Sequence, residues 1–276
     1  MDVIMFFKAI ILGIVEGLTE FAPVSSTGHM IIVDDLWLQS NVFLTAPVAN
    51  TFKVVIQLGS ILAVVIVFWP RLLNLLHLKK PGRAENGQKR RLRLTHVFIG
   101  LLPAGALGVL FEDLIDTHLF STRTVIFGLI LGAFLMIAAD RFAPKTMTQR
   151  VDEITYQQAF FIGLIQCFSL WPGFSRSGST ISGGVLLGLS HRAAADFTFI
   201  MAVPIMAGAS VLSLIKNWQY FTLDVWPFFL SGFIASFVVA LLTIHFFLKL
   251  IDRIKLVPFA LYRIGLALVI TLVIYF

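Results

Sequence analysis

The sequence predicts an all-α integral membrane protein, organised as an inverted-topology repeat with six transmembrane helices and two re-entrant helix-loop-helix hairpins. Three observations lead to this fold class: an apolar composition, six apolar runs of membrane length, and two similar polar-centred segments that lie 150 residues apart. The chain of 276 residues is 58% hydrophobic and only 13% charged. Soluble domains are much less apolar, so a polytopic helical membrane protein is expected.

Six apolar runs are long enough to cross a hydrocarbon core, which requires roughly 20 helical residues. They lie at 52–76, 94–111, 124–141, 197–215, 226–249 and 256–275. The single cysteine, Cys167, lies in an apolar segment and excludes an intrachain disulfide.

The charged residues between these runs predict the orientation of the spans. Eight of the 21 Lys and Arg residues lie between Arg71 and Arg93, and positive loops stay in the cytoplasm. This concentration in one loop explains the net charge of +6 and argues against a nucleic-acid partner. The remaining loops then alternate: 112–123 and 216–225 outside, 142–155 and 249–255 inside.

The two similar segments are 9–32 and 159–182, and they align at a shift of 150 without a gap. The loop charges require 4–37 to begin and end outside and 156–190 to begin and end inside. Each is therefore either a re-entrant hairpin or a pair of full spans, and its short arms and polar Pro-Gly-Ser tip favour the hairpin. The repeats are then 1–145 and 146–276, each a hairpin plus three spans, with the hairpin tips meeting near the midplane of one compact domain.

Two carboxylates distinguish the first hairpin. Glu16 and Glu20 are four residues apart and share one helical face. Ionised carboxylates are costly at membrane depth, so the pair requires a cation, a shared proton or water. Its oxygen ligands suit Mg²⁺ or Ca²⁺, and the pair is predicted to hold that divalent cation or to take a proton.

The tip of the first hairpin contains hydroxyl groups and a histidine. Ser25, Ser26 and Thr27 follow Pro23 and can bind an anion together with backbone N–H groups. His29 follows Ser26 by one helical turn, which predicts a nucleophile with a nearby base; an N-cap with a buried histidine is the structural alternative.

The second hairpin supplies the positive charge. Arg176 lies among hydroxyl groups and after a glycine, and its guanidinium matches phosphate oxygens. An ion pair between Arg176 and a carboxylate of the first hairpin is the structural alternative. The predicted phosphate-binding residues here are Arg176 with Gly173, Ser175, Ser177 and Thr180.

The motifs E-G-L-T-E and P-G-F-S-R-S-G-S-T, at Glu16–Glu20 and Pro172–Thr180, resemble those of the undecaprenyl-diphosphate phosphatase family of the bacitracin-resistance type. The resemblance extends over nearly the whole chain; Lys53 and Ala22 depart from residues common in relatives. It implies removal of the terminal phosphate from a C55 polyprenyl diphosphate, which recycles the lipid carrier for cell-wall glycans. It also implies a divalent cation, a bacterial inner membrane and a site reached from the outer, periplasmic side.

The predicted protein is thus a membrane lipid diphosphatase. The attacking group is Ser26, activated by His29 or Glu20, or else a water activated by the same groups. The alternative function is a flippase for a polyprenyl phosphate lipid, with Glu16 and Glu20 as a coupling pair. The sequence leaves the oligomeric state open, including a homodimer.

Overall fold

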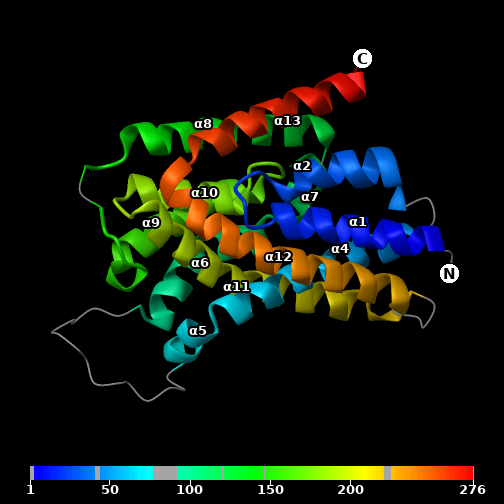
Figure 1. The fold of residues 1–276 in the computed structure, drawn as a ribbon, viewed down its shortest axis with the longest axis horizontal. Coiled ribbons are helices and arrows are strands. Elements are labelled where there is room, and N and C mark those ends of the chain that lie inside the picture. The colour runs from blue at the N-terminus through cyan, green and yellow to red at the C-terminus, as the bar shows by residue number, and fades with distance from the viewer. Residues whose placement is uncertain are drawn as a thin grey trace.

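The computed structural model describes residues 3–40, 44–76, 92–119, 121–145, 147–220 and 225–275, and these residues are mostly helical (Figure 1). The α-helices are α1 Val3–Thr19, α2 Ser26–Met30, α4 Ala46–Val67, α5 Trp69–Leu75, α6 Leu94–Leu110, α7 Glu112–Leu119, α8 Thr122–Phe142, α9 Tyr156–Gln166, α10 Arg176–Leu186, α11 His191–Lys216, α12 Trp226–Ile254 and α13 Val257–Tyr275. A π-helix, η1 (Ile31–Leu38), continues α2, and the short 3₁₀ segments are η2 Val151–Glu153, η3 Cys167–Leu170 and η4 Trp218–Tyr220. Among the described residues, the single β-type pairing is a bridge between Thr148 and Leu189.

Among the described residues, five helices are long and apolar enough to cross a membrane, which confirms a multi-pass membrane protein. They are α4, α8, α11, α12 and α13. The predicted run 94–111 forms α6, which has 17 residues and is shorter than these five. The count of six spans therefore stays a prediction.

The first predicted span, 52–76, differs from the structure at both ends. Its helix, α4, begins at residue 46 and ends at Val67, and α5 then begins at Trp69. Pro70 has no N–H to donate to the preceding turn, so a continuous helix is interrupted where Phe68 leaves helical geometry (φ −99°, ψ 11°).

Parts of the loop-charge prediction lie outside the described residues. These are residues 77–91 of the basic loop, residues 221–224, and the side chains of Glu112, Asp113 and Asp116. The orientation that those charges predict therefore stays a prediction.

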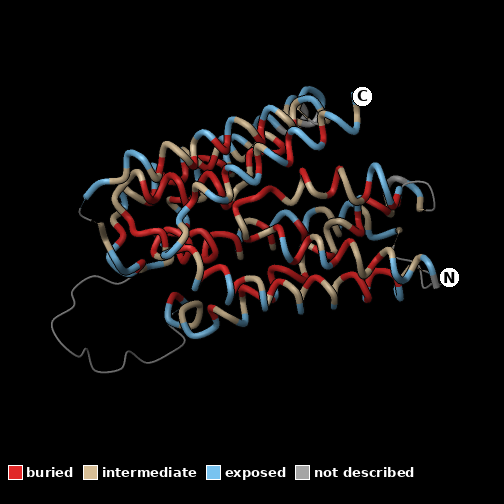
Figure 2. The backbone as a smooth tube through the Cα atoms, turned by 45° about the horizontal axis from the view of Figure 1, so that its top comes forward, coloured by how far each residue is buried: buried red, intermediate tan, exposed pale blue. Residues whose placement is uncertain are grey.

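The long helices pack into an elongated bundle. α12 packs against both α1 and α4, α11 lies beside α4, α6 packs on α9, and α13 pairs with α8 (Figure 1). Buried positions follow the faces that helices turn toward one another, as Figure 2 shows. Large apolar side chains on the outer faces, such as Leu242 and Leu268, are exposed, as expected for surfaces that face lipid.

Glycines allow the closest helix contacts, and they do so in corresponding places of the two segments that align by sequence. A Cβ on Gly13 of α1 would collide with the Gly232 carbonyl of α12. A Cβ on Gly163 of α9 would collide in the same way with the Gly100 carbonyl of α6. Gly13 and Gly163 are related by the shift of 150, so the aligned residues make matching contacts.

The turns at the two hairpin tips also match. Ser25 precedes α2 with φ 71° and ψ 100°, and Ser175 precedes α10 with φ 73° and ψ 118°. This left-handed region is uncommon for residues other than glycine and often marks functional sites. Each serine hydroxyl accepts a hydrogen bond from the backbone N–H three residues later, from Gly28 and Gly178 respectively.

Candidate active site

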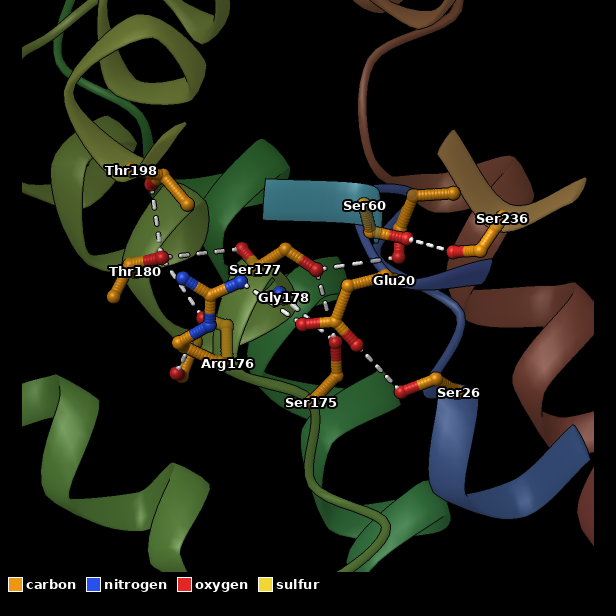
Figure 3. Close-up of polar contacts among 12 residues, drawn as sticks. Glu20, Ser26, Ser60, Ser175, Arg176, Ser177, Gly178, Thr180, Thr198 and Ser236 are labelled. Atoms are coloured by element: carbon orange, nitrogen blue, oxygen red, sulfur yellow. Dashed lines mark hydrogen bonds and ion pairs between the residues drawn. The ribbon is translucent and has the colours of Figure 1, made fainter. Parts of the chain in front are cut away.

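The two hairpin tips meet at an ion pair. Glu20 follows the last turn of α1, and Arg176 is the first residue of α10. Arg176 Nη2 lies 3.1 Å from Glu20 Oε1, and both side chains are largely buried, with 15% and 8% exposed (Figure 3). The structure thus brings together two residues that are 156 positions apart in the sequence.

The second carboxylate oxygen of Glu20 binds the predicted nucleophile. Ser26 Oγ donates a 2.8 Å hydrogen bond to Glu20 Oε2, so Glu20 lies between Ser26 and Arg176 (Figure 3). A carboxylate at this distance can accept the hydroxyl proton directly. Of the two activating groups that the sequence left open, Glu20 is the one in contact with Ser26.

His29 makes other contacts. Its Nδ1 lies 2.8 Å from the Ser25 carbonyl, and its Nε2 lies 2.7 Å from the hydroxyl of Tyr262 on α13. A carbonyl only accepts, so Nδ1 carries a hydrogen, and Nε2 of the neutral ring accepts from Tyr262. The expected pairing with Ser26 is not formed, because the ring turns back over the first turn of α2 and stacks on Tyr262 (5.6 Å between ring centroids).

Glu16 lies one turn before Glu20 and is 5% exposed. The Glu20 N–H donates to the Glu16 carbonyl (3.0 Å), so the two residues are one helical turn apart. Within the described part of the chain, no three His, Cys, Asp or Glu residues form a metal-binding group. The two carboxylates and the Ser26 hydroxyl still suit Mg²⁺, which commonly uses one or two carboxylates and completes its shell with water and phosphate oxygens. The residues therefore fit the predicted divalent cation.

The hydroxyl groups of Ser175, Ser177 and Thr180 lie around the backbone of Arg176. Ser177 Oγ lies 3.2 Å from Ser175 Oγ and donates to the Ala22 carbonyl of the first hairpin. Thr180 Oγ1 donates to the Arg176 carbonyl and accepts from Thr198 Oγ1 of α11 (2.8 Å; Figure 3). Thr180 thus supports the backbone of Arg176 from the buried side.

The guanidinium of Arg176 retains binding capacity. Its Nη1 atom is buried and has no hydrogen-bond partner among the described residues. A buried donor without a partner is costly, and a phosphate oxygen would satisfy it. The N-terminus of α10 adds backbone N–H groups and the positive end of a helix dipole to the same place.

The other predicted binding residues have identifiable positions. Thr27 lies half-buried in the first turn of α2, next to Ser26. Gly173 has φ +89°, and a Cβ there would collide with the Val125 carbonyl of α8. Its role is therefore to let the loop turn closely against α8.

An apolar cavity of about 480 Å³ adjoins His29. Its lining residues are Val15, Leu18, Thr19, Val24, His29, Val33, Pro258, Phe259 and Tyr262. The cavity lies between the first hairpin and the start of α13, and offers an apolar surface next to His29 and Tyr262.

Sequence reasoning missed two residues of α13 that contact the hairpin tips. Tyr262 binds His29, and Arg263 donates to the carbonyls of Gly173 and Phe174. A charged residue inside an apolar run was a signal that could have identified Arg263. Tyr262 gave no comparable signal, since a tyrosine in a membrane helix is often interfacial.

Comparison with known proteins shows the relatives of this chain. A family model described as "Bacitracin resistance protein BacA" matches residues 9–269. A protein of Geobacillus kaustophilus named undecaprenyl-diphosphatase is 73% identical over 265 residues, covering 96% of each chain. Proteins of the same name from Anoxybacillus flavithermus and Bacillus subtilis are 69% and 62% identical, covering 99% and 97% of each chain. The chain with the Glu20–Arg176 centre therefore belongs to the bacitracin resistance protein BacA family.

Proposed function

We propose that this membrane protein is an undecaprenyl diphosphatase, which hydrolyses undecaprenyl diphosphate to undecaprenyl phosphate and inorganic phosphate. The family and the names of the full-length relatives support this function. Such a reaction regenerates a lipid carrier for cell-wall synthesis and explains bacitracin resistance. The family and the names of the relatives give no support to the flippase alternative, in which Glu16 and Glu20 would couple transport of a polyprenyl phosphate.

The observation that carries the chemistry is the pair of contacts made by Glu20. One oxygen binds the Ser26 hydroxyl and the other binds Arg176, so a candidate nucleophile, base and phosphate-binding group lie within one hydrogen-bonded chain. Transport requires charged groups and hydrogen-bond donors, but it does not require a hydroxyl group that is hydrogen-bonded to a carboxylate.

We infer a covalent route from this geometry. Ser26 Oγ attacks the terminal phosphorus, its proton passes to Glu20 Oε2, and the bond between phosphorus and the bridging oxygen breaks to release undecaprenyl phosphate. Arg176 binds the oxygens on which negative charge is concentrated in the transition state. Water then attacks the phosphoserine, the bond from phosphorus to Ser26 Oγ breaks, and Glu20 returns the proton to that oxygen. In the rival route, Glu20 activates a water that attacks the diphosphate directly.

A divalent cation fits this site as a proposal. Glu16 and Glu20 would hold Mg²⁺ or Ca²⁺, which supplies charge neutralisation for the diphosphate oxygens when it is bound. Hydrolysis should then stop after exhaustive chelation and return when Mg²⁺ is added. Activity that is untouched by chelation would instead favour proton transfer by the carboxylate pair.

The apolar cavity beside His29 is suited to the first isoprene units of the lipid. Its lining is mostly apolar, and His29 of the first hairpin forms part of its wall. Only the diphosphate then needs the polar centre, while the remainder of the tail stays in the bilayer. The diphosphate head group can therefore bind at Glu20 and Arg176 without transfer of the lipid tail into water.

For the membrane arrangement, we infer six spans and two re-entrant hairpins in an inverted repeat, with the site open to the outer side of the inner membrane. Support comes from the matched turns at Ser25 and Ser175 and from the matched contacts of Gly13 and Gly163. Polar loops at membrane depth are tolerated when they are buried in protein, as these tips are.

Phosphate release by the purified protein in detergent tests the function. Undecaprenyl diphosphate is the substrate, and Arg176→Ala should lower kcat by at least roughly 100-fold because a transition-state contact is lost. Arg176→Lys should also fail largely, because a point charge cannot replace a planar fork of donors. Ser231→Ala, which removes a buried hydroxyl bonded to the Phe228 carbonyl of α12, is the matched control and should remain active. Absence of phosphate release by the wild-type protein would contradict the proposed function.

A further inference from the structure

Arg263 is the largest fully buried side chain of the described residues, with 0% of its surface exposed. It lies within α13, one of the helices that can cross a membrane. Among the described residues, it forms no salt bridge with a carboxylate. A buried charge of this kind is expensive in a membrane protein, and such residues usually serve function.

The hydrogen bonds of Arg263 lead to the loop before Arg176. Its Nη2 atom lies 2.9 Å from the Gly173 carbonyl and 2.8 Å from the Phe174 carbonyl. The same atom lies 3.2 Å from the Gly128 carbonyl of α8. A single guanidinium group therefore holds two successive peptide groups of the loop and fastens them to a neighbouring helix.

This contact fixes the direction of the chain at Ser175. The carbonyl of Phe174 and the N–H of Ser175 belong to one planar peptide group and point in opposite directions. Holding the carbonyl toward Arg263 directs that N–H away from it and stabilises the uncommon backbone of Ser175 (φ 73°). The next residue is Arg176, so the orientation of its backbone follows from the same contact.

Arg263 also lies directly behind the first turn of α10. A Cβ added to Gly178 would lie 2.9 Å from Arg263 Nη1, and the Gly178 N–H closes the turn onto Ser175 Oγ. A full positive charge thus lies against the turn whose N-terminus faces the proposed phosphate. The charges of Glu16, Glu20, Arg176 and Arg263 sum to zero when all four groups are ionised.

We propose that Arg263 is a positioning residue for hydrolysis: it orients the Gly173–Ser175 loop so that Arg176 meets the phosphate, and places a second positive charge behind that phosphate-binding turn. This role rests on the proposed diphosphatase function. The ligand chemistry it serves is the doubly charged terminal phosphate, for which inorganic phosphate and orthovanadate are probes.

The test uses the full chain in detergent with undecaprenyl diphosphate, and measures kcat, KM, inhibition by orthovanadate and the melting temperature. Arg263→Lys keeps the charge, but its side chain is shorter and lacks the planar guanidinium that places Nη2 against the three carbonyls and Nη1 beside Gly178. It should lower kcat by about tenfold with a smaller change in KM. Arg263→Gln removes the charge as well and should lower kcat by roughly 100-fold or more. Both variants should need several-fold more orthovanadate for half inhibition.

A matched control separates this role from general stability. Arg192, at the start of α11, also donates to a backbone carbonyl, that of Leu248, and pairs with Asp196. Arg192→Lys should leave kcat and orthovanadate inhibition within about twofold of the wild type, even if it lowers the melting temperature. Equal kinetic losses in the Arg192 and Arg263 variants would overturn the proposal.

A second variant tests the contact if the Arg263 variants do not fold. Gly132 of α8 faces the same guanidinium, and a Cβ there would lie 2.6 Å from the Phe174 carbonyl oxygen and would also collide with Arg263 Nη2. Gly132→Ala should therefore reproduce the loss of kcat and the weaker orthovanadate inhibition while Arg263 is retained. Wild-type kinetics for folded Gly132→Ala or folded Arg263→Lys would overturn the positioning role, whereas an inactive wild-type protein would contradict the diphosphatase function itself.

Discussion

The carboxylate of Glu20 binds the Arg176 guanidinium through one oxygen and the Ser26 hydroxyl through the other. Arg176 stabilises its charged form, and Ser26 places a proton 2.8 Å from its other oxygen. A diphosphate that binds to Arg176 competes with Glu20 for the guanidinium donors. Substrate binding would then weaken the ion pair and leave Glu20 free to accept the Ser26 proton.

The first prediction at the residue scale concerns Ser26. Ser26→Ala should reduce hydrolysis by several orders of magnitude, because covalent catalysis cannot proceed without its nucleophile. Rapid quenching of the wild-type reaction with labelled substrate should trap phosphate on the peptide that contains Ser26. If the Ala variant keeps more than about a tenth of the rate, the attack belongs to a water and Ser26 only binds phosphate.

The second prediction concerns Tyr262. Tyr262→Phe removes the hydroxyl that binds His29 Nε2 but keeps the stacked ring, and should lower kcat by a few-fold, as expected for one hydrogen bond worth about 1 kcal/mol. In His29→Gln the same change at Tyr262 should have almost no further effect, since the two residues act through one contact. Full additivity of the two losses in kcat would show that Tyr262 acts independently of His29.

At the scale of the elements, the close helix contacts provide a test that is independent of chemistry. Gly13→Ala and Gly163→Ala each place a methyl group against a backbone carbonyl of the facing helix. Each should lower the free energy of unfolding by about 1–3 kcal/mol, measured by denaturation in detergent. Gly105→Ala in α6 meets nothing within 4 Å and should be neutral or slightly stabilising. Equal stability of the three variants would mean that the helices do not approach as closely as described.

Most helices and part of the candidate site could be predicted from patterns in the sequence. Apolar run length and repeated motifs are local signals. They predicted all six helical runs, and they predicted that Glu20, Ser26 and Arg176 lie close together, as the structure shows. The break at Phe68 was missed, although Pro70 signalled it. The pairing of His29 with Tyr262 joins residues 233 positions apart, and no local pattern encodes such a contact.

At the scale of the whole molecule, sidedness is the property that the function depends on. In a cysteine-free Cys167→Ser background, a cysteine at Asn86 should resist an impermeant thiol reagent in intact cells, because the charge of the basic loop predicts a cytoplasmic location. A cysteine at Thr117 in α7 should react. The reverse labelling pattern would place the entrance of the first hairpin on the cytoplasmic side and contradict the proposed outer access.

The neighbouring residues Tyr262 and Arg263 have a consequence for the whole bundle. Successive side chains on an α-helix point about 100° apart, so one of them reaches the first hairpin and the other reaches the second. A displacement of α13 thus carries both tips in the same direction and tends to preserve the distance between Glu20 and Arg176. Insertion of one residue just before Tyr262 would turn this register by about 100° and detach both tips at once. The relative position of Glu20 and Arg176, which lie far apart in the sequence, therefore depends on the rotation of α13 about its own axis.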